Sequence, residues 1–293
     1  MKNNWNKEEL EEFFSFSSDE IKFLANKNEA TRLGFAILFK FFQNESRFPK
    51  YSSEVPKTII TYISRVLDID SQLFLEYDWN GRTIKRHRAE IRQIFSFEET
   101  KLSDLKEIKE WLIKSVVPEN TDFEYSKERV FQKLKTLKLE PPSDLQIERM
   151  IKSAIKTYEN ALYNRIYSVL NKETISKIDL LIVGNEDGDN EYNLSFKDFK
   201  KAPEGINVDS SLHEIEKLKS IESLNLPEKV FKDISEKIIE KFYRRVNAEE
   251  LSEVLIHPNE IKYSLLYIFF MHKKAQITDN LSNLLSETIH KLE

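Results

Sequence analysis

The residues of this chain that could do chemistry are mostly cations gathered in one short stretch. Between Asn80 and Arg92, a single acidic residue, Glu90, stands among five basic ones: Arg82, Lys85, Arg86, Arg88 and Arg92. Arginine presents planar, bidentate donors that match guanine edges and phosphates, and lysine adds a point charge. The stretch therefore predicts a surface that binds nucleic acid, with a solvated basic face that has no partner as the alternative.

A helix has to position these cations. At about 100° per residue, Ile84, Ile91 and Phe95 fall on one side, with Ile94 at its edge. The opposite side, around the small Ala89, carries Arg82, Lys85, Arg86, Arg92 and Gln93. The spacing predicts a recognition helix from Thr83 to Phe95 that docks by its apolar side. Thr83 is also a candidate DNA contact. We expect His87 to project near the apolar side and Arg88 near the opposite flank of that side.

Two more segments carry candidate contacts. The run Arg47-Phe48-Pro49-Lys50 lies between two predicted helices, so Arg47 and Lys50 are predicted to touch the DNA phosphate backbone from a loop. An ordinary surface loop is the alternative. The second segment, from Lys127 to Lys156, holds eight basic and four acidic residues.

A helix is predicted to start within that second segment. Pro141 and Pro142 cannot continue a helix, and Ser143 with Gln146 has the spacing of a capping box. The apolar face of the predicted helix, Ser143 to Leu170, carries Ile147, Ile151, Ala154 and Tyr158, and the opposite face carries Arg149, Lys152 and Lys156. Together with a helix from Ser126 to Leu137, it fits a helix-turn-helix unit, with Ser143 and the basic face as candidate DNA contacts.

The fold class follows from composition and spacing. Five glycines and eight prolines in 293 residues, with apolar residues at helical steps such as Val55, Ile59, Ile63 and Val66, predict an all-α, multi-domain protein. Asn28–Asn44 reads as a central buried helix. The other predicted helices are 6–14, 103–117, a helix begun near 174 in place of a strand at 180–183, 212–223, 227–246, 258–274 and 278–292.

Two breaks divide the chain into three predicted domains. The proline-containing stretch 117–122 and the turn-rich stretch 184–193 separate a DNA-binding domain (1–118), a second DNA-binding domain (119–192) and a helical dimerisation or scaffold region (193–293). The net charge of −5 is unevenly distributed: residues 172–293 hold 17 basic and 23 acidic side chains. We expect this acidic third to contact protein and to repel DNA.

Several functions are disfavoured by the residue types. The absence of cysteine excludes a disulfide scaffold, a cysteine nucleophile and a thiolate-bound metal, and the five glycines form no nucleotide-binding loop. The five histidines form no ligand pair, Asp187, Asp189 and Glu191 lack the glycine of a calcium loop, and we expect no metal or other cofactor. Tyr263, Tyr267, Phe269 and Phe270 read as core or as a subunit interface. With no signal segment and no membrane span, we expect a soluble, cytoplasmic protein.

The motifs that carry a family resemblance run along most of the chain. They are Thr31 to Ala36, Arg47-Phe48-Pro49, Val55-Pro56, Tyr62-Ile63, Asp78 to Arg92, Trp111, Glu140-Pro141-Pro142, Ile147-Glu148-Arg149, Ile256-His257-Pro258 and Ile277-Thr278-Asp279. The chain resembles the N-terminal region of bacterial transposases of the Tn-three family. One departure is Phe95-Ser96-Phe97, where the family has Leu-Gly-Phe, which leaves the end of the recognition helix open.

The resemblance implies a function. Such transposases carry out replicative transposition, their N-terminal helical domains bind the terminal inverted repeats of the transposon in two segments, and the full-length protein is a homodimer. It also implies that the catalytic carboxylates and their divalent metals belong to a ribonuclease-H-like domain that this chain lacks, so that the chain is a fragment. We therefore expect sequence-specific binding of double-stranded DNA. A helical protein-interaction scaffold without specific DNA binding is the alternative.

Overall fold

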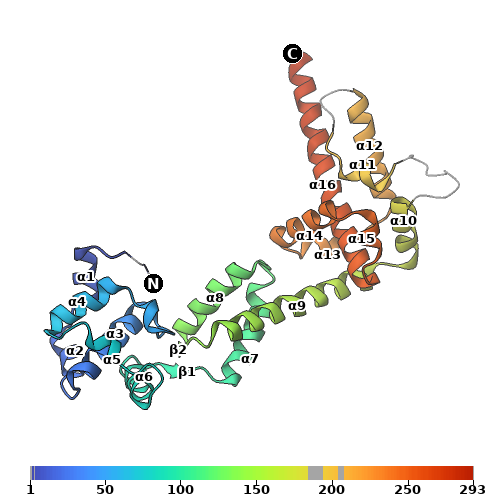
Figure 1. Ribbon diagram of the computed structural model, residues 1–293. Helices are drawn as coiled ribbons and strands as arrows, with labels where there is room; N and C mark the ends of the chain where they lie inside the picture. Colours follow the sequence, from blue (N-terminus) through green and yellow to red (C-terminus); the bar gives the residue numbers. More distant parts are fainter. Residues whose placement is uncertain (1, 3, 184–193, 204–207, 293) are drawn as a thin grey trace. The chain divides into compact units, whose positions relative to one another are not determined.

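The computed structural model describes residues 2, 4–183, 194–203 and 208–292 (Figure 1). These residues form sixteen α-helices and two strands of two residues each, which confirms the all-α class. The chain divides into two compact units. Unit 1 consists of residues 1–108 and 127–148, and unit 2 of residues 109–126 and 149–293. These limits differ from the predicted limits at 118 and 192, because helices α8 (Phe123–Thr136) and α9 (Asp144–Val169) each contribute to both units.

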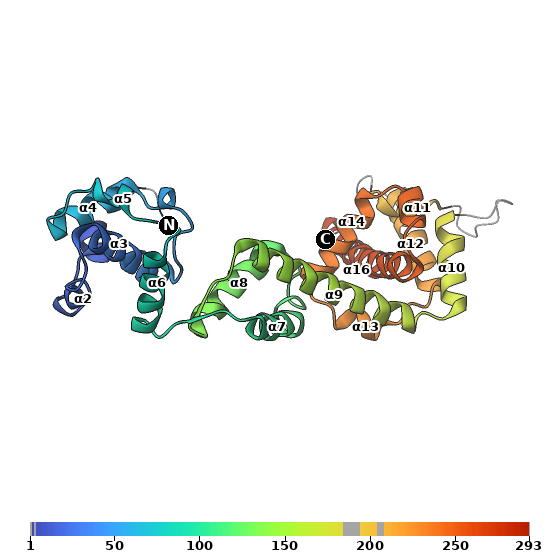
Figure 2. The same cartoon turned by 60° about the horizontal axis from the view of Figure 1, so that its bottom comes forward.

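Unit 1 is built around the central helix α3 (Glu29–Glu45), as predicted. Every residue from Leu33 to Phe42 is buried, so this stretch of the helix is buried on all sides, with Lys40 paired to Glu20. Figures 1 and 2 show α4 (Lys57–Leu67), α5 (Leu73–Glu76) and α6 (Arg82–Ile94) arranged around it, with α1 (Lys7–Phe14) also in contact. The short helix α2 (Ser18–Lys22) and the 3₁₀ turn Ser52–Glu54 complete this part of the unit.

The turn before α6 is held tightly against α3. A Cβ atom on Gly34 would lie only 2.3 Å from a ring carbon of Tyr77, so the glycine lets this ring approach α3 closely. Asp78 accepts a hydrogen bond from the Asn80 amide at 2.9 Å, which closes the turn. Trp79 packs edge-on against Tyr77, with ring centroids 6.0 Å apart. The motif preceding the helix therefore fixes where α6 begins.

The C-terminal end of α6, which the sequence left open because of Ser96, is defined in the structure. The helix ends at Ile94, and Ser96 takes the left-handed conformation with φ 57°. The Phe97 amide donates to the Arg92 carbonyl at 2.8 Å and the Ser96 amide donates to the Gln93 carbonyl at 3.1 Å. This is the hydrogen-bond pattern of a Schellman cap, so serine fills the position that glycine normally takes.

Beyond α6 the chain forms a parallel pair of short strands. Strand β1 (Glu98–Glu99) pairs with β2 (Leu139–Glu140), which lies between α8 and α9. Thr100 reinforces the pair, because its hydroxyl donates to the Glu140 carbonyl at 2.5 Å. The start of α9 is thereby attached to α6 within unit 1. Between the strands, α7 (Leu102–Trp111) continues into a π-helical turn, Leu112–Val116.

Unit 2 is organised around α16 (Asn259–Leu292), which contacts α12 (Val208–Ser223), α13 (Glu228–Lys232) and α14 (Glu236–Ala248). Every residue from Tyr263 to Met271 is buried. The aromatic run in this stretch is therefore core, as one of the two predicted possibilities had it. The remaining helices are α10 (Lys172–Val183), α11 (Phe196–Lys200) and α15 (Leu251–Leu255), and α10 confirms helix over strand at 180–183.

Two predicted helix boundaries in unit 2 are wrong. The predicted helix 227–246 is two helices, because the chain turns between Lys232 and Glu236 and buries Ile234 in the core. The predicted helices 258–274 and 278–292 are one, since the Thr278 hydroxyl donates to the Lys274 carbonyl at 2.8 Å within the helix and does not cap a new one. The short helices α2, α5, α11 and α15 went unpredicted. The calcium-like residues 187, 189 and 191 lie outside the described residues.

Candidate nucleic-acid interface

The outward face of α6 is a row of cations around a small residue. Arg82, Lys85, Arg86, Ala89 and Gln93 are all exposed, as the helical spacing predicted, whereas Arg92, predicted on the same face, is half-buried. Within the described part of the chain, the first three of these form no ion pair. Their charge is therefore available to an outside partner, and Ala89 leaves room for that partner to approach the helix closely.

The opposite face of α6 anchors the helix in the core. Ile84 and Ile91 are buried, and Thr83 is half-buried beside them. The single acidic residue of the stretch, Glu90, accepts from the Lys27 ammonium at 2.8 Å. Because this carboxylate is already paired, it does not cancel the charge of the outward face.

His87 is a structural residue on this inner face, where the sequence placed it. Its Nδ1 atom lies 2.7 Å from the Tyr77 hydroxyl, and its ring stands edge-on to Phe35 with centroids 5.1 Å apart. Burial lowers the pKa of His87 to about 4, and the nearby charge of Lys27 adds to the effect. Burial also raises the pKa of Tyr77, so its protonated hydroxyl donates to a neutral imidazole.

Two of the five cations of the stretch are used inside the protein. Arg88 donates to the Pro49 carbonyl at 2.9 Å, its guanidinium lies 5.3 Å from the centroid of the Phe48 ring, and burial lowers its pKa. Arg92 pairs with Glu140 at 2.5 Å, and its side chain is only 18% exposed. The five cations predicted as contacts on α6 thus divide into three without an ion pair among the described residues and two that hold neighbouring segments.

A cleft in unit 1 brings together candidates that are far apart in the sequence. It has a volume of about 770 Å³ and lies between the loop at Arg47–Lys50, helix α6 and the start of α9. Six predicted contact residues line it: Arg47, Lys50, Lys85, Arg88, Arg92 and Ser143. The sequence indicated each of these segments separately, and the fold joins them in one site.

Carboxylates already occupy several cations of this cleft. Arg47 pairs with Glu54 at 2.8 Å, and Lys50 pairs with Asp144 in the first turn of α9. The predicted capping box at Ser143 is confirmed, because the Gln146 amide donates to the Ser143 hydroxyl oxygen at 3.4 Å and the Ser143 amide donates to Gln146 Oε1 at 3.2 Å. A phosphate entering the cleft would exchange with these carboxylates.

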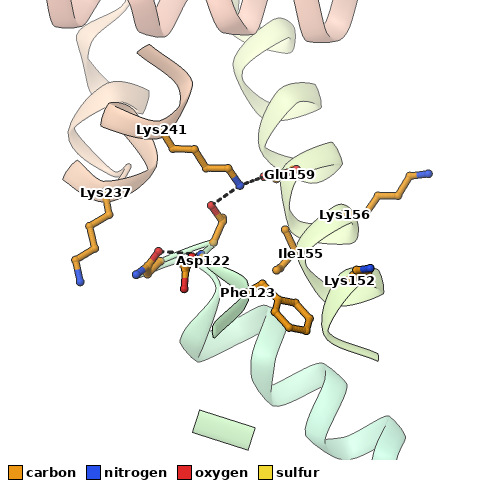
Figure 3. A pocket seen from close by; sticks show the side chains of 10 residues that line it. Asp122, Phe123, Lys152, Ile155, Lys156, Glu159, Lys237 and Lys241 are labelled. Atoms are coloured by element: carbon orange, nitrogen blue, oxygen red, sulfur yellow. Dashed lines mark hydrogen bonds and ion pairs between the residues drawn. The ribbon is translucent and has the colours of Figure 1, made fainter. Parts of the chain in front are cut away.

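The second predicted group of cations lies on α9 in unit 2. Arg149, Lys152 and Lys156 are exposed, and Ile151 and Ala154 on the other face are buried. Two lysines from α14, Lys237 and Lys241, line the same pocket as Lys152 and Lys156 (Figure 3). Sequence reasoning missed these two lysines. Their spacing of four residues on one helix was the available signal, but the net acidity of residues 172–293 concealed it.

Comparisons with known proteins decide the family. A family model described as a domain of unknown function, DUF4158, matches residues 1–154. The chain belongs to this family. It is also 22% identical over 269 residues to the transposase for transposon Tn1546 of Enterococcus faecium, an alignment that covers 91% of this chain and 27% of the relative. The transposase for transposon Tn2501 of Escherichia coli is 23% identical over 263 residues, covering 89% of this chain and 26% of the relative.

A third relative gives the same result. The transposase for transposon Tn501 of Pseudomonas aeruginosa is 22% identical over 295 residues, covering 97% of this chain and 28% of the relative. The chain thus spans little more than a quarter of the length of these curated relatives. The DUF4158 match and the transposases together confirm the resemblance to the N-terminal region of the Tn-three family.

The DUF4158 match contains the whole of the site in unit 1. It ends at residue 154, within α9, so it includes α6, the cleft, Arg149 and Lys152 but neither Lys156 nor the lysines of α14. Among the described residues, no three acidic or histidine side chains are grouped as a metal site requires. In that same part of the chain, no helix has the length and apolar character to cross a membrane.

Proposed function

We propose that this DUF4158 chain binds duplex DNA at the terminal inverted repeats of a transposon, as the recognition part of a transposase. One observation carries the proposal. The outward face of α6 presents Arg82, Lys85 and Arg86, exposed and without an ion pair among the described residues, on a helix whose other face is buried. The transposase relatives indicate transposon DNA as the target, and the cations on the outward face of α6 could bind it.

The dimensions of α6 suit a major groove. Its 13 residues span about 20 Å, and a groove about 12 Å wide admits one helix. Arginine donates two hydrogen bonds to guanine, and the small Ala89 allows close approach. Arg47 and Lys50 contact phosphates from the adjoining loop, which fixes the position of the helix along the duplex without reading sequence.

The proposal concerns recognition alone. Strand transfer by carboxylates that hold divalent metals is what the family resemblance assigns to a ribonuclease-H-like domain, and no step of that chemistry is attributed to this chain. The homodimer implied by the resemblance is likewise a property of the full-length transposase. Arg149, Lys152 and Lys156 on α9 provide a second contact with the duplex, in keeping with a target that is bound in two segments.

The test is a binding titration with an inverted-repeat duplex and a scrambled duplex over a salt series. We expect a log-log salt slope near −5 if about six phosphates are neutralised. Substituting Arg82, Lys85 and Arg86 with alanine should remove the preference for the repeat, since each good base contact contributes about 1–3 kcal/mol of discrimination. Lys229→Ala, an exposed lysine of α13, is the control and should bind as the wild type does.

The alternative of a protein-interaction scaffold predicts different results. A scaffold would show no preference for the repeat and little dependence on salt. Equal behaviour of the triple variant and Lys229→Ala would reject α6 as the reading helix, even if the chain binds DNA in some other way.

A further inference from the structure

Four lysines surround one pocket of unit 2 although the surrounding sequence is acidic. The pocket has a volume of about 740 Å³ and lies between the segment Asn120–Phe123, helix α9 and helix α14. Lys152 and Lys156 come from α9, and Lys237 and Lys241 come from α14. Among the described residues that line it, the carboxylates are Asp122 and Glu159, which gives these residues a net charge of +2.

Both carboxylates are already engaged by the fold. Glu159 accepts from the Lys241 ammonium at 2.8 Å, and the same ammonium donates to the Thr121 hydroxyl at 2.9 Å. The Asp122 carboxylate accepts from the Tyr125 amide at 2.8 Å, where it caps the start of α8. Glu159 is therefore paired with Lys241, whereas Asp122 forms no ion pair with a lysine of the pocket among the described residues.

Two of the pocket lysines, Lys156 and Lys237, are placed to meet an anion. Figure 3 shows Lys241 reaching from α14 toward Glu159, while Lys156 from α9 and Lys237 from α14 extend away from this pair. Both of the latter are exposed, and neither forms an ion pair among the residues that the structure describes. The Lys237 ammonium lies 5.5 Å from the Tyr125 ring centroid, a cation–π distance, and no carboxylate pairs with it among the described residues.

We propose that this pocket binds the phosphodiester backbone of DNA, with Lys156 and Lys237 as the contacting cations and Lys241 as the residue that holds α14 against α9. The inference rests on the proposed function and extends it to α14, a helix of the acidic third of the chain. A lysine ammonium is a point charge that suits phosphate and reads no sequence, so this contact adds affinity for any duplex. The half-exposed floor at Phe123 and Ile155 offers an apolar surface to the sugars.

The test uses the full chain and the double variant Lys156→Ala/Lys237→Ala. Lys241 is left in place, because its loss would leave Glu159 unpaired. The matched control is Lys219→Ala/Lys229→Ala, which removes two exposed lysines from α12 and α13, outside the pocket. Affinities for the repeat and for the scrambled duplex are measured between 50 and 200 mM salt.

We expect the pocket variant to lower the magnitude of the log-log salt slope by about 1.8, since each phosphate contact contributes about 0.9. The loss of affinity should then be about tenfold larger at 50 mM than at 200 mM salt, and equal on both duplexes. Wild-type affinity and slope in the pocket variant, or an equal loss in the control, would overturn the inference. The absence of any duplex binding by the wild type would overturn it together with the proposed function.

Two further outcomes separate this inference from the proposed function and from binding of a free anion. If the wild type binds both duplexes equally, recognition of the repeat fails, while the pocket variant still tests the phosphate contact on either duplex. Inorganic phosphate, compared with chloride at equal ionic strength in a thermal-shift assay, tests a free anion as the ligand. Stabilisation of the wild type but not of the pocket variant, with duplex affinity unchanged between them, would reject DNA as the occupant.

Discussion

Arg92→Ala should damage the fold of unit 1 more than it damages contact with DNA. The Arg92 guanidinium lies 2.5 Å from Glu140 and 3.6 Å from Glu99. The Arg92 and Glu140 side chains are 18% and 17% exposed, so the pair is largely withdrawn from water. Since Glu140 belongs to β2, directly before α9, the pair connects α6 to the start of that helix.

The size of the effect follows from this burial. Removing one partner of a fully buried ion pair costs about 3–5 kcal/mol, and the remaining exposure of this pair reduces the expected cost to about 2–3 kcal/mol. Burial already raises the pKa of Glu140, against the opposing hydrogen bond from Arg92. Without Arg92 the folded-state pKa rises further above the ordinary value of 4.5, so the penalty is present at neutral pH and shrinks as pH falls toward 4.5.

A double-mutant cycle with Glu140→Gln tests this reasoning. Urea unfolding of the wild type, both single variants and the double variant should give a coupling energy of about 1–2 kcal/mol, because the glutamine leaves no buried charge. Duplex affinity, measured where each protein remains folded, should fall less in Arg92→Ala than in Arg86→Ala. Additive destabilisation, or a loss of stability that is equal at pH 7 and pH 4.5, would refute the account.

Two further predictions concern the ends and the inner face of α6. His87 should titrate with a midpoint of about 4 in histidine NMR spectra, and a midpoint above 6 would contradict its burial. Because the folded-state pKa of His87 lies below the ordinary value of 6.5, the free energy of unfolding should decline as pH falls from 6.5 to 4, by at most about 1.4 kcal/mol per pH unit. Ser96→Gly should raise the free energy of unfolding by about 1 kcal/mol, since glycine adopts φ 57° without strain; no gain in a urea titration would show that Ser96 is not strained.

The sequence was sufficient to predict the helices that carry the site, since their signals are local. The apolar period of α6 and the capping box at Ser143 each lie within a few residues, and the structure places both where they were expected. The ion-pair and hydrogen-bond partners of the basic side chains were not predictable, because they depend on contacts between distant segments. Nothing in the basic stretch indicates that Arg92 meets Glu140, 48 positions away.

The acidic third of the chain, residues 172–293, also contains a feature that the sequence did not predict. A regional sum of charge describes a whole segment, but an anion is bound by the few side chains around it. Lys241 reaches Thr121, 120 positions away, so α14 contributes to a basic pocket that no window of the sequence contains. Likewise, Thr278 could cap a helix or lie within one from its sequence, and in the structure α16 continues through it.

The ion pairs in the cleft of unit 1 amount to counterions supplied by the protein itself. Glu54, Asp144 and Glu140 hold Arg47, Lys50 and Arg92 in place before any ligand arrives. A loosely fitting polyanion would have to displace these carboxylates while gaining few good contacts. The duplex of the proposed function would also contact Arg82, Lys85 and Arg86 of α6, which form no ion pair among the described residues. Under the proposed function, such internal competition would lower affinity for RNA and other non-cognate polyanions, and the carboxylates of this basic site would select against ligands that do not also contact α6.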